Sequence, residues 1–375
     1  MKVLTIVGTR PEVIKLSRVI AELDACCKHV LVHTGQNYDY SLNQVFFDQL
    51  GIRRPDRFLE VVGEDVGQTI GNIIARSYEV LRAEAPDALL VLGDTNSCLS
   101  VISAKRLKIP VFHMEAGNRC FDERVPEEIN RRLVDHASDV NLPYTEHARR
   151  YLLAEGLRPE LVIKTGSPMR EVLDYYRKGI ESSDALTRLG LEAGKYFLVS
   201  AHREENVDDP ENFRDLLDTL QGLHEHYRLP VVVSTHPRTR KRLDDTRISD
   251  TDGGVRFVEA MGFFDYVKLQ LDACCVLSDS GTTTEESSIL GFPAITIRQA
   301  HERPEGMDEG TLVMSGLKRK DVLDAVRVVM RQRSDSARVF RPVPDYEADN
   351  VSKKVVRLIF SYTDYVNRTV WRKPG

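Results

Sequence analysis

Acidic and basic side chains are concentrated in residues 111–135, VFHMEAGNRCFDERVPEEINRRLVD. The apolar beginning of this stretch is short enough for a buried strand, and Glu115 follows it directly. A loop and a helix-like segment from Pro126 add Asp122, Glu123, Glu127, Glu128, Arg119, Arg124, Arg131 and Arg132. Carboxylates gathered near arginines can have their pKa values pushed apart, as general acid–base catalysis requires. A surface loop can carry such charges without any function. Glu115, however, ends a strand, where α/β proteins place ligand-facing groups, so we interpret this stretch as the catalytic segment.

A second acid stands in a similar place. Asp94 ends the apolar run of DALLVLGDTNSCLSVISAKRL, which reads as a strand, a sharp turn and a helix. An Asp at this position can serve simply as a helix cap. Two acids that end consecutive strands would nevertheless point into one crevice, and this pairing favours a functional role for Asp94 and Glu115.

Basic residues follow the first expected strand, residues 2–7, in the segment GTRPEVIKLSRVIAEL. Arg10 and Lys15 lie beside a helix start at Pro11, where the helix dipole and free backbone N–H groups can hold an anion. The segment is not GxGxxG, so the fingerprint of a dinucleotide site is absent. A solvated arginine at a helix start is the simpler interpretation of this segment taken alone.

Short apolar strands alternate with helical stretches along the chain, which predicts an α/β protein with parallel sheets. Further strands are expected at 29–34, 139–143, 161–165, 196–200, 231–234, 275–277 and 294–297, with helices at 67–82, 146–155 and 352–365. The length of 375 residues favours two domains. Glycine and proline place the end of the first domain near residues 166–168.

In the second half each expected strand stops at a polar turn, again the ligand edge of a parallel sheet. His202 and His236 stand at two of these turns, each beside an arginine. The turn SDSGTTTEES offers Ser280, Gly281 and the following helix start as donors to a phosphate, while Glu286 could accept hydrogen bonds from a ribose. No GKS or GKT follows, so this is not a P-loop, and a plain Ser/Gly helix cap remains the alternative.

Composition narrows the classes of partner. The formal charge of −5 and the isoelectric point near 6.1 give no reason to expect a nucleic acid or a membrane surface. There is no run of about 18 apolar residues and no signal peptide, which predicts a cytosolic protein. The six cysteines contain no CxxC, so free buried thiols are expected rather than a zinc site or a disulfide framework.

The segments GTRPEVIK, LGDTNS, HMEAGNR with PEEINRR, SAHREEN, STHPR, SDSGTTTEES and HERPEG occur in this order between residues 8 and 306. Together they closely resemble the non-hydrolysing UDP-N-acetylglucosamine 2-epimerase family over nearly the whole chain. The resemblance implies the GT-B fold, two Rossmann-like domains that face each other across a cleft. Residues 1–167 would carry the catalytic acids and 168–355 would bind UDP, with a terminal helix, 356–375, packing back on the first domain.

The implied chemistry eliminates UDP to give a 2-acetamidoglycal and then re-adds it after carbon 2 is reprotonated on the opposite face. No NAD and no metal are required, and a homodimer serving bacterial polysaccharide synthesis, such as capsule or O-antigen, is the implied setting. By the family's motifs, the residues at the reacting sugar are Asp94, Glu115, Glu127 and His202. The residues matching charge-stabilising or UDP contacts are Arg10, Lys15, Arg131, His202, His236, Tyr266, Ser280, Gly281, Glu286 and Arg303, with Tyr266 stacking on uracil.

Departures from the common pattern suggest a branch of the family. GQNYDYSL replaces the QHREML loop that contributes to an allosteric nucleotide-sugar site in other members, so the sequence does not predict that regulation. The segments NYDY, MEAGNRCFD and YTDYVNRTVW resemble the branch that converts UDP-2-acetamido-2,6-dideoxy-L-talose to UDP-N-acetyl-L-fucosamine. Cys120 or Phe121 would suit a 6-deoxy methyl group, although such pockets discriminate against an added hydroxyl by only roughly a hundredfold.

Four alternatives remain open at the level of sequence. The first is the same epimerisation with UDP-N-acetylglucosamine as substrate and UDP-N-acetylmannosamine as product. The second is a GT-B glycosyltransferase, which would need an acceptor site and would not exchange the proton on carbon 2. The third is a hydrolysing epimerase, in which free UDP would accumulate. The fourth is a nucleotide-sugar sensor without activity, which would have no need of three converging acids.

Overall fold

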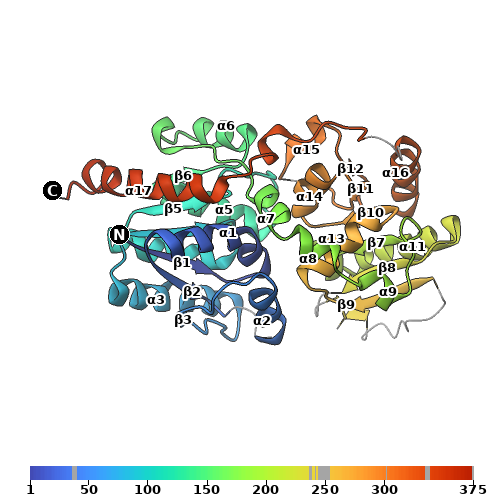
Figure 1. Ribbon diagram of the computed structural model, residues 1–375, viewed down its shortest axis with the longest axis horizontal. Coiled ribbons are helices and arrows are strands. Elements are labelled where there is room, and N and C mark those ends of the chain that lie inside the picture. Colours follow the sequence, from blue (N-terminus) through green and yellow to red (C-terminus); the bar gives the residue numbers. More distant parts are fainter. Residues whose placement is uncertain are drawn as a thin grey trace. The chain divides into compact units, whose positions relative to one another are not determined.

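The computed structural model describes residues 1–35, 40–235, 239–240, 242–243, 254–300, 302–333 and 338–373, without the side chains of 40–44 and 204–205. The polar loop at 36–39 and His236 therefore lie outside the described residues. The chain divides into two compact units (Figure 1). The first contains Met1–Tyr175 and Asp345–Gly375, and the second contains Tyr176–Pro344.

The first unit is built on a six-stranded sheet in which every pair of neighbours is parallel. In pairing order its strands are β3 (Arg57–Phe58), β2 (Lys28–His33), β1 (Lys2–Val7), β4 (Ala88–Leu92), β5 (Val111–Met114) and β6 (Val140–Leu142). This is the 3-2-1-4-5-6 order of the Rossmann fold. The helices of this unit are α1 (Arg10–Cys26), α2 (Tyr40–Gln49), α3 (Val66–Glu84), α4 (Val101–Arg106), α5 (Pro126–Ala137), α6 (Glu146–Ala154), α7 (Met169–Tyr175) and α17 (Val351–Thr369).

The second unit repeats this winding in a second six-stranded parallel sheet. Its strands pair in the order β12 (Val313–Met314), β11 (Ala294–Thr296), β10 (Cys275–Ser278), β7 (Phe197–Ser200), β8 (Val231–Thr235) and β9 (Val255–Glu259). Numbered from β7, this is the Rossmann order again. The helices are α8 (Arg177–Glu181), α9 (Ala185–Leu189), α10 (Glu204–Val207), α11 (Pro210–Tyr227), α13 (Phe263–Asp272), α14 (Thr282–Leu290), α15 (Pro304–Asp308) and α16 (Arg319–Gln332).

The central strands are apolar on both faces because helices cover both sides of each sheet. All five residues of β4, ALLVL, are buried, as expected for a parallel strand inside an α/β layer. Helix α1 begins with a capping box in which Thr9 and Glu12 satisfy each other's free backbone groups, with Pro11 in the first turn. Its buried stripe of Leu16, Val19, Ile20 and Leu23 then packs on the core.

Helix α17 returns from the end of the chain to the first unit and packs against α1 (Figure 1). Its buried face contains Val351, Val355, Val356, Ile359 and Val366. The return begins at Asp345, earlier than the expected 356, and the first unit ends at Tyr175 rather than near 167. The two ends of the chain therefore share one unit.

Three local predictions need correction. The strand expected at 161–165 is a short 3-10 turn, Pro159–Leu161, followed by a single bridge between Asn141 and Val162. Backbone bonds from Ile163 N–H to Asn141 O and from Thr165 N–H to Pro143 O still run beside β6, but they form isolated bonds rather than a continuous ladder. Strands β3, β9 and β12 were not predicted, and their two- to five-residue patterns are too short or too exposed to stand out. The six thiols are free, yet Cys26 is exposed and only Cys98, Cys274 and Cys275 are fully buried.

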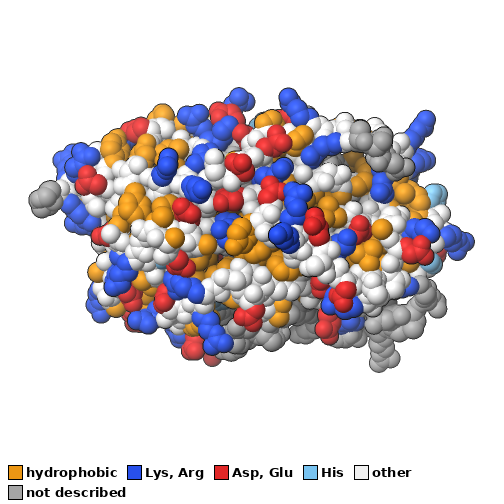
Figure 2. All heavy atoms as spheres, viewed as in Figure 1, with side chains coloured by type: hydrophobic (Ala, Val, Ile, Leu, Met, Phe, Trp, Pro, Cys, Tyr) orange, Lys and Arg blue, Asp and Glu red, His pale blue; other side chains and the backbone are white. Residues whose placement is uncertain are grey.

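The described helices include none that is long and apolar enough to span a bilayer. Basic and acidic side chains are interspersed over the face of the molecule drawn in Figure 2.

Candidate active site

The strand order defines one topological switch point in each unit. In the first sheet β1 pairs with both β2 and β4, so the chain winds outward in opposite directions from this point. Ligands of open α/β sheets bind outside the carboxyl ends of the strands at such a switch point. The loop after β1 and the turns after β4 and β5 meet there, and they contain Arg10, Asp94 and Glu115.

Glu115 and Lys15 form a close, shielded ion pair. Lys15 Nζ lies 2.6 Å from Glu115 Oε2, and the two side chains are only 3% and 12% exposed. Lys15 also lies over the ring of Tyr144, 5.6 Å from its centroid. An ammonium group at this distance favours the ionised carboxylate, the form that can accept a proton.

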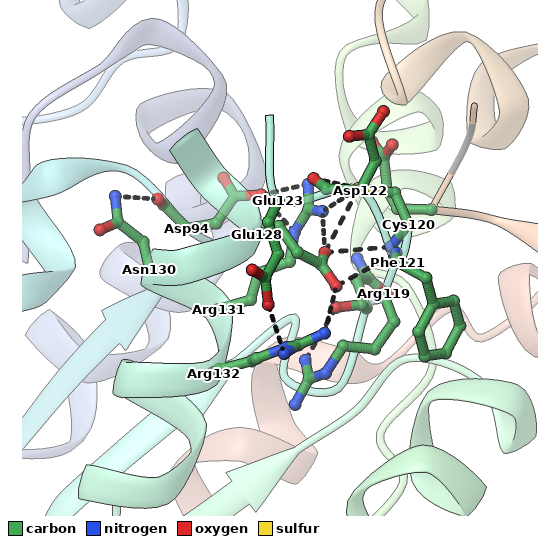
Figure 3. Close-up of polar contacts among 12 residues, drawn as sticks. Asp94, Arg119, Cys120, Phe121, Asp122, Glu123, Glu128, Asn130, Arg131 and Arg132 are labelled. Atoms are coloured by element: carbon green, nitrogen blue, oxygen red, sulfur yellow. Dashed lines mark hydrogen bonds and ion pairs between the residues drawn. The ribbon is translucent and has the colours of Figure 1, made fainter. Parts of the chain in front are cut away.

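Arg131 connects Asp94 to Glu128 (Figure 3). Its Nε and Nη2 donate to Asp94 Oδ2 at 2.8 and 2.7 Å, and its Nη1 donates to Glu128 Oε2 at 2.9 Å. Asn130, one residue earlier on α5, donates to the backbone oxygen of Asp94 at 2.9 Å. The guanidinium is 3% exposed, whereas Asp94 is 26% exposed, so the aspartate is the more accessible partner.

The turns that carry the two predicted acids are adjacent. The strands β4 and β5 pair in register from Leu89–Val111 to Leu92–Met114. The N–H of Gly93 continues the ladder by donating to Met114 O at 3.0 Å. Glu115 is therefore opposite Gly93, and Asp94 follows Gly93 on the neighbouring strand end, with the two strands about 4.8 Å apart. The structure therefore places the Lys15–Glu115 and Arg131–Asp94 ion pairs on adjacent strand-end turns.

Two neighbouring glutamates on α5 have different environments. Glu128 is fully buried and accepts bonds from the N–H groups of Cys120 and Phe121. Burial alone would raise the pKa of Glu128, but the bonds from Cys120 N–H and Arg131 hold it below its usual value. Glu127 is half-buried and has no hydrogen-bond or ion-pair partner within the described part of the chain. Glu128 is thus committed to holding the loop, while Glu127 remains available for a ligand.

In the loop between Glu115 and α5, two adjacent residues that the sequence does not distinguish have different surroundings in the structure. The thiol of Cys120 lies 3.6 Å from Arg131 Nη1 and 3.3 Å from Glu128 Oε2, so it faces the Arg131–Glu128 pair. The ring of Phe121 points away from Asp94 (Figure 3) and meets Tyr151 edge-on, with the centroids 5.4 Å apart. Its side chain is 64% exposed. Of the two, only Cys120 is in place to contact a sugar beside Arg131.

A buried glutamate that was not among the predicted site residues ties these loops together. Glu12 accepts bonds from Gly8 N, Thr9 N and Thr9 Oγ1 on one side, and from Thr95 Oγ1 and Ser97 Oγ on the other. Burial raises the pKa of Glu12, although these hydrogen bonds oppose the shift. The T-x-x-E capping box was the available sequence signal. Arg10 lies beside this loop, half-buried, with its guanidinium 5.4 Å from the ring centroid of Phe46.

In the second unit the switch point lies between β7 and β10. Asp279, which is fully buried, accepts bonds from the backbone N–H groups of His202 and Arg203 at 2.9 Å each. The side chain of His202 is 42% exposed, and its Nδ1 lies 3.2 Å from Asp279 Oδ1. Asp279 thereby fixes the turn that presents the imidazole at the carboxyl edge of the sheet.

The turn after β10 supplies donors at the start of α14. Ser280 Oγ and Thr282 Oγ1 are hydrogen-bonded to each other at 3.0 Å. A Cβ at position 281 would lie 2.2 Å from Glu302 Oε1, so a side chain there would require Glu302 to move. Glu286, one turn into the helix and buried, accepts a bond from Gln270 Nε2 at 2.6 Å.

Tyr266 and Arg303 border this edge from two further helices. Tyr266 packs on the core cluster of Tyr196 and Leu198. Burial and the charge of Glu286 raise the pKa of the Tyr266 phenol well above its usual value, against bonds to Ser200 and Ser278. Arg303 is buried at the start of α15 and forms an ion pair with Glu285 at 2.9 Å. His236 alone among the predicted site residues lies outside the described residues.

The family model for UDP-N-acetylglucosamine 2-epimerase matches residues 21–360. The chain belongs to the UDP-N-acetylglucosamine 2-epimerase family. It is accordingly an isomerase. The predicted α/β fold with two Rossmann-like sheets of the GT-B type is confirmed.

Solved structures and curated relatives agree with this assignment. The structure of UDP-N-acetylglucosamine 2-epimerase from Rickettsia bellii is 57% identical, covers 100% of both chains and has a TM-score of 0.92. The Methanocaldococcus jannaschii UDP-GlcNAc 2-epimerase, solved in complex with UDP-GlcNAc and UDP, is 31% identical over 96% of this chain and 100% of its own, with a TM-score of 0.90. A UDP-2,3-diacetamido-2,3-dideoxy-D-glucuronate 2-epimerase from Pseudomonas aeruginosa is 33% identical over 87% of this epimerase and 92% of the relative. Relatives of similar identity therefore differ in the sugar they are named for.

Proposed function

We propose that this epimerase inverts carbon 2 of a UDP-N-acetylhexosamine by eliminating UDP and re-adding it through a 2-acetamidoglycal. One observation carries the proposal. The two carboxylates that end neighbouring strands, Asp94 and Glu115, each have a shielded cation at 2.6–2.8 Å. This arrangement supplies a base for a weakly acidic C–H bond and positive charge for a departing phosphate.

The reaction runs in two halves. A carboxylate takes the proton from carbon 2 while the bond between carbon 1 and the β-phosphate oxygen breaks, leaving a carbon 1–carbon 2 double bond and UDP. The β-phosphate oxygen then re-attacks carbon 1, and an acid delivers a proton to the opposite face of carbon 2. Asp94, Glu115 and Glu127 are the proposed proton-transfer groups. Only acids, bases and cations are needed, so the proposal includes no NAD and no metal.

Charge develops on the β-phosphate as the bond breaks, and fixed cations stabilise it best where it appears. Lys15, Arg131 and Arg10 at the first sheet are the proposed cations, with His202 from the second. In the second unit Ser280, Gly281 and the start of α14 suit a phosphate, and Glu286 suits a ribose diol. Arg303, Tyr266 as the uracil platform and His236 complete the proposed UDP site.

The proposed sugar is UDP-2-acetamido-2,6-dideoxy-L-talose, converted to UDP-N-acetyl-L-fucosamine. The support is the small side chain of Cys120 beside Arg131, because a cysteine suits a methyl better than a hydroxymethyl. The alternative is UDP-N-acetylglucosamine to UDP-N-acetylmannosamine, the activity named for several relatives. A pocket of this kind discriminates by roughly a hundredfold, so kinetics must choose between the two.

We further propose a homodimer working in the cytoplasm on polysaccharide precursors for capsule or O-antigen. Ile129 and Leu133 on α5 are 52% and 51% exposed, and Ile102 on the neighbouring α4 is 38% exposed. A second copy covering this apolar strip would remove it from water. Light scattering should give twice the mass of the chain, and a monomer at all concentrations would contradict the dimer.

Incubation in heavy water with each nucleotide sugar, followed by proton NMR at carbon 2, tests the reaction. Deuterium should enter the L-talose substrate and its product without release of free UDP. Exchange only into UDP-N-acetylglucosamine would select the alternative substrate. Accumulating UDP would indicate a hydrolysing enzyme, and tight UDP binding without exchange would favour glycosyl transfer.

Replacing Glu115 by glutamine tests the assignment of the acid. Glu115→Gln should lower kcat by at least roughly a hundredfold, while UDP affinity stays within about threefold because the UDP site lies on other residues. Glu123→Gln is the matched control, since Glu123 lies in the same loop, is 73% exposed and pairs with Arg132 alone among the described residues. A fully active Glu115→Gln enzyme would remove Glu115 from the mechanism.

A further inference from the structure

Glu115 sits in a backbone conformation that must be held in place. Its φ of 62° is left-handed, a region that residues with a Cβ seldom adopt and that persists only when surrounding contacts fix it. Gly117, two residues on, is also left-handed, with a φ of 84°. A Cβ at Gly117 would lie 2.4 Å from Ala148 O, so this turn is closely enclosed.

Asp135, on α5, holds this turn from behind. Its two carboxylate oxygens accept from Gly117 N–H at 3.2 and 3.1 Å. Asp135 is fully buried. The carboxylate is therefore fixed behind the strand end, and it does not take part in the Asp94–Arg131 and Lys15–Glu115 pairs described above.

Two further buried side chains contact Asp135. Arg119 Nη1 donates to Asp135 Oδ2 at 2.7 Å and to Asn118 O at 2.8 Å, and its other nitrogens form a fork on Glu155 at 2.8 and 2.6 Å. His113 Nδ1 lies 2.9 Å from Asp135 Oδ1, and its Nε2 donates to Gly93 O at 2.8 Å. Arg119 and His113 are each 1% exposed.

This cluster of His113, Arg119 and Asp135 contacts both turns that carry the proposed acids. It holds Gly117 N–H just after Glu115, and Gly93 O just before Asp94. We propose that the cluster positions these two carboxylates for proton transfer, with Asp135 as the central positioning residue. The inference rests on the proposed function of Glu115. Displacing a catalytic group by about 1 Å can lower a rate roughly a hundredfold, so a fixed turn is a kinetic requirement as well as a structural one.

The chain offers a matched control in Asp139. Asp139 is also buried, also pairs with a cation, Lys105, and also accepts from a β5 backbone N–H, that of Val111 at 2.9 Å. It holds the amino end of β5, whereas Asp135 holds the carboxyl end. Asp135→Asn and Asp139→Asn therefore remove comparable buried charges at opposite ends of one strand.

In the folded enzyme, Asp135→Asn should lower kcat by roughly tenfold to a hundredfold, with KM and UDP affinity within about twofold. Asp139→Asn should leave kcat within about twofold of wild type. This should hold even if Asp139→Asn loses as much thermal stability as Asp135→Asn does. A crystal structure of Asp135→Asn should show Glu115 leaving its left-handed φ. A kcat equal to that of Asp139→Asn, or an unchanged Glu115 backbone, would overturn the inference.

Arg119→Lys provides a second variant if Asp135→Asn fails to fold. It keeps a buried positive charge beside Asp135 but cannot bridge Asp135 and Glu155 together. A several-fold lower kcat at unchanged KM is expected, and a wild-type kcat would count against the cluster. If Glu115→Gln proves fully active, the proposed role of Glu115 fails, while the backbone geometry in the Asp135→Asn crystal still tests whether the cluster holds the turn.

Discussion

At the scale of single residues, the environment of each side chain decides its use more than its type does. Glu127 and Glu128 are identical and adjacent, yet Glu128 is fully buried and bound to Arg131 and to two backbone N–H groups. Its depressed pKa means that Glu128 stabilises the fold above its unfolded pKa, and this contribution is lost as the pH falls through the folded value. Glu127 keeps an accessible carboxylate.

His33 makes a prediction about stability and pH. It is 2% exposed, its Nδ1 accepts from Gly35 N–H at 2.9 Å, and burial lowers its pKa to about 4 from 6.5. The unfolded chain therefore binds the proton first. The free energy of unfolding therefore keeps its full value above pH 6.5 with respect to this histidine. It falls as the pH is lowered towards 4, by about 3 kcal/mol in total.

His33→Asn should flatten this part of the pH profile, because the amide oxygen can replace Nδ1 as the acceptor and does not titrate. Urea unfolding at several pH values between 4 and 7 measures the difference between the two proteins. Equal slopes for wild type and variant would show that His33 does not bind a proton on unfolding in this range.

At the scale of elements, the sites are made by turns at strand ends, and the helices hold those turns. Helix α5 supplies Asn130 and Arg131, which both bond to Asp94, and Asp135, about one turn later, which binds Gly117 N–H. Lys15 reaches Glu115 from α1, one hundred residues away in sequence. Small shifts of α1 or α5 would therefore move the charges on which the proposed chemistry depends.

Gly117→Ala tests how closely α6 encloses the catalytic turn. The substitution adds a Cβ at a φ of 84° and 2.4 Å from Ala148 O. It should destabilise the protein by about 1–2 kcal/mol for the backbone plus about 1–3 kcal/mol for overpacking.

Gly156→Ala is the control, because Gly156 has a similar φ of 87° with nothing within 4 Å of the added Cβ. Gly156→Ala should lower the free energy of unfolding only by the backbone contribution of about 1–2 kcal/mol. Chemical denaturation of both variants gives the two values, and equal losses would show that the turn can move away from α6.

At the scale of the whole molecule, the two units repeat one winding order, and the last segment of the chain completes the first unit. Helix α17 packs on α1, so residues from both ends of the chain share one core. Trp371, the only tryptophan, lies just after this helix, with Lys105 Nζ 4.5 Å from its ring centroid. Its fluorescence therefore reports on the first unit.

Ile359→Ala should destabilise the first unit by about 2–5 kcal/mol, because a fully buried side chain would leave a cavity between α17 and the unit. The midpoint of the Trp371 fluorescence transition in denaturant should fall accordingly. Phe360→Ala removes a larger but 46% exposed side chain from the same helix and should shift the midpoint much less. Equal shifts would mean that α17 does not depend on its buried face.

Patterns within a few residues were sufficient to predict most strands and the turns after them. The apolar runs ending at Val7, Leu92 and Met114 are local signals, because a strand buried on both faces is apolar throughout. Parallel strands have their carboxyl ends at one edge, so the order of residues alone is enough to predict that Asp94 and Glu115 lie together. Exposed or two-residue strands such as β9 and β12 lack that signal.

The tertiary structure decided what the other side chains do. Sequence alone does not distinguish the roles of Cys120 and Phe121, or explain why Asp135 is buried, because those outcomes depend on contacts with Arg131, Tyr151 and Gly117. The sequence by itself determined the family, the sheet class and the candidate acids, since these follow from residue types and local order. Only the tertiary structure decided the partner, the burial and the backbone conformation of each acid. A buried charge is stable only if a partner reaches it, and these partners come from segments far apart in the chain.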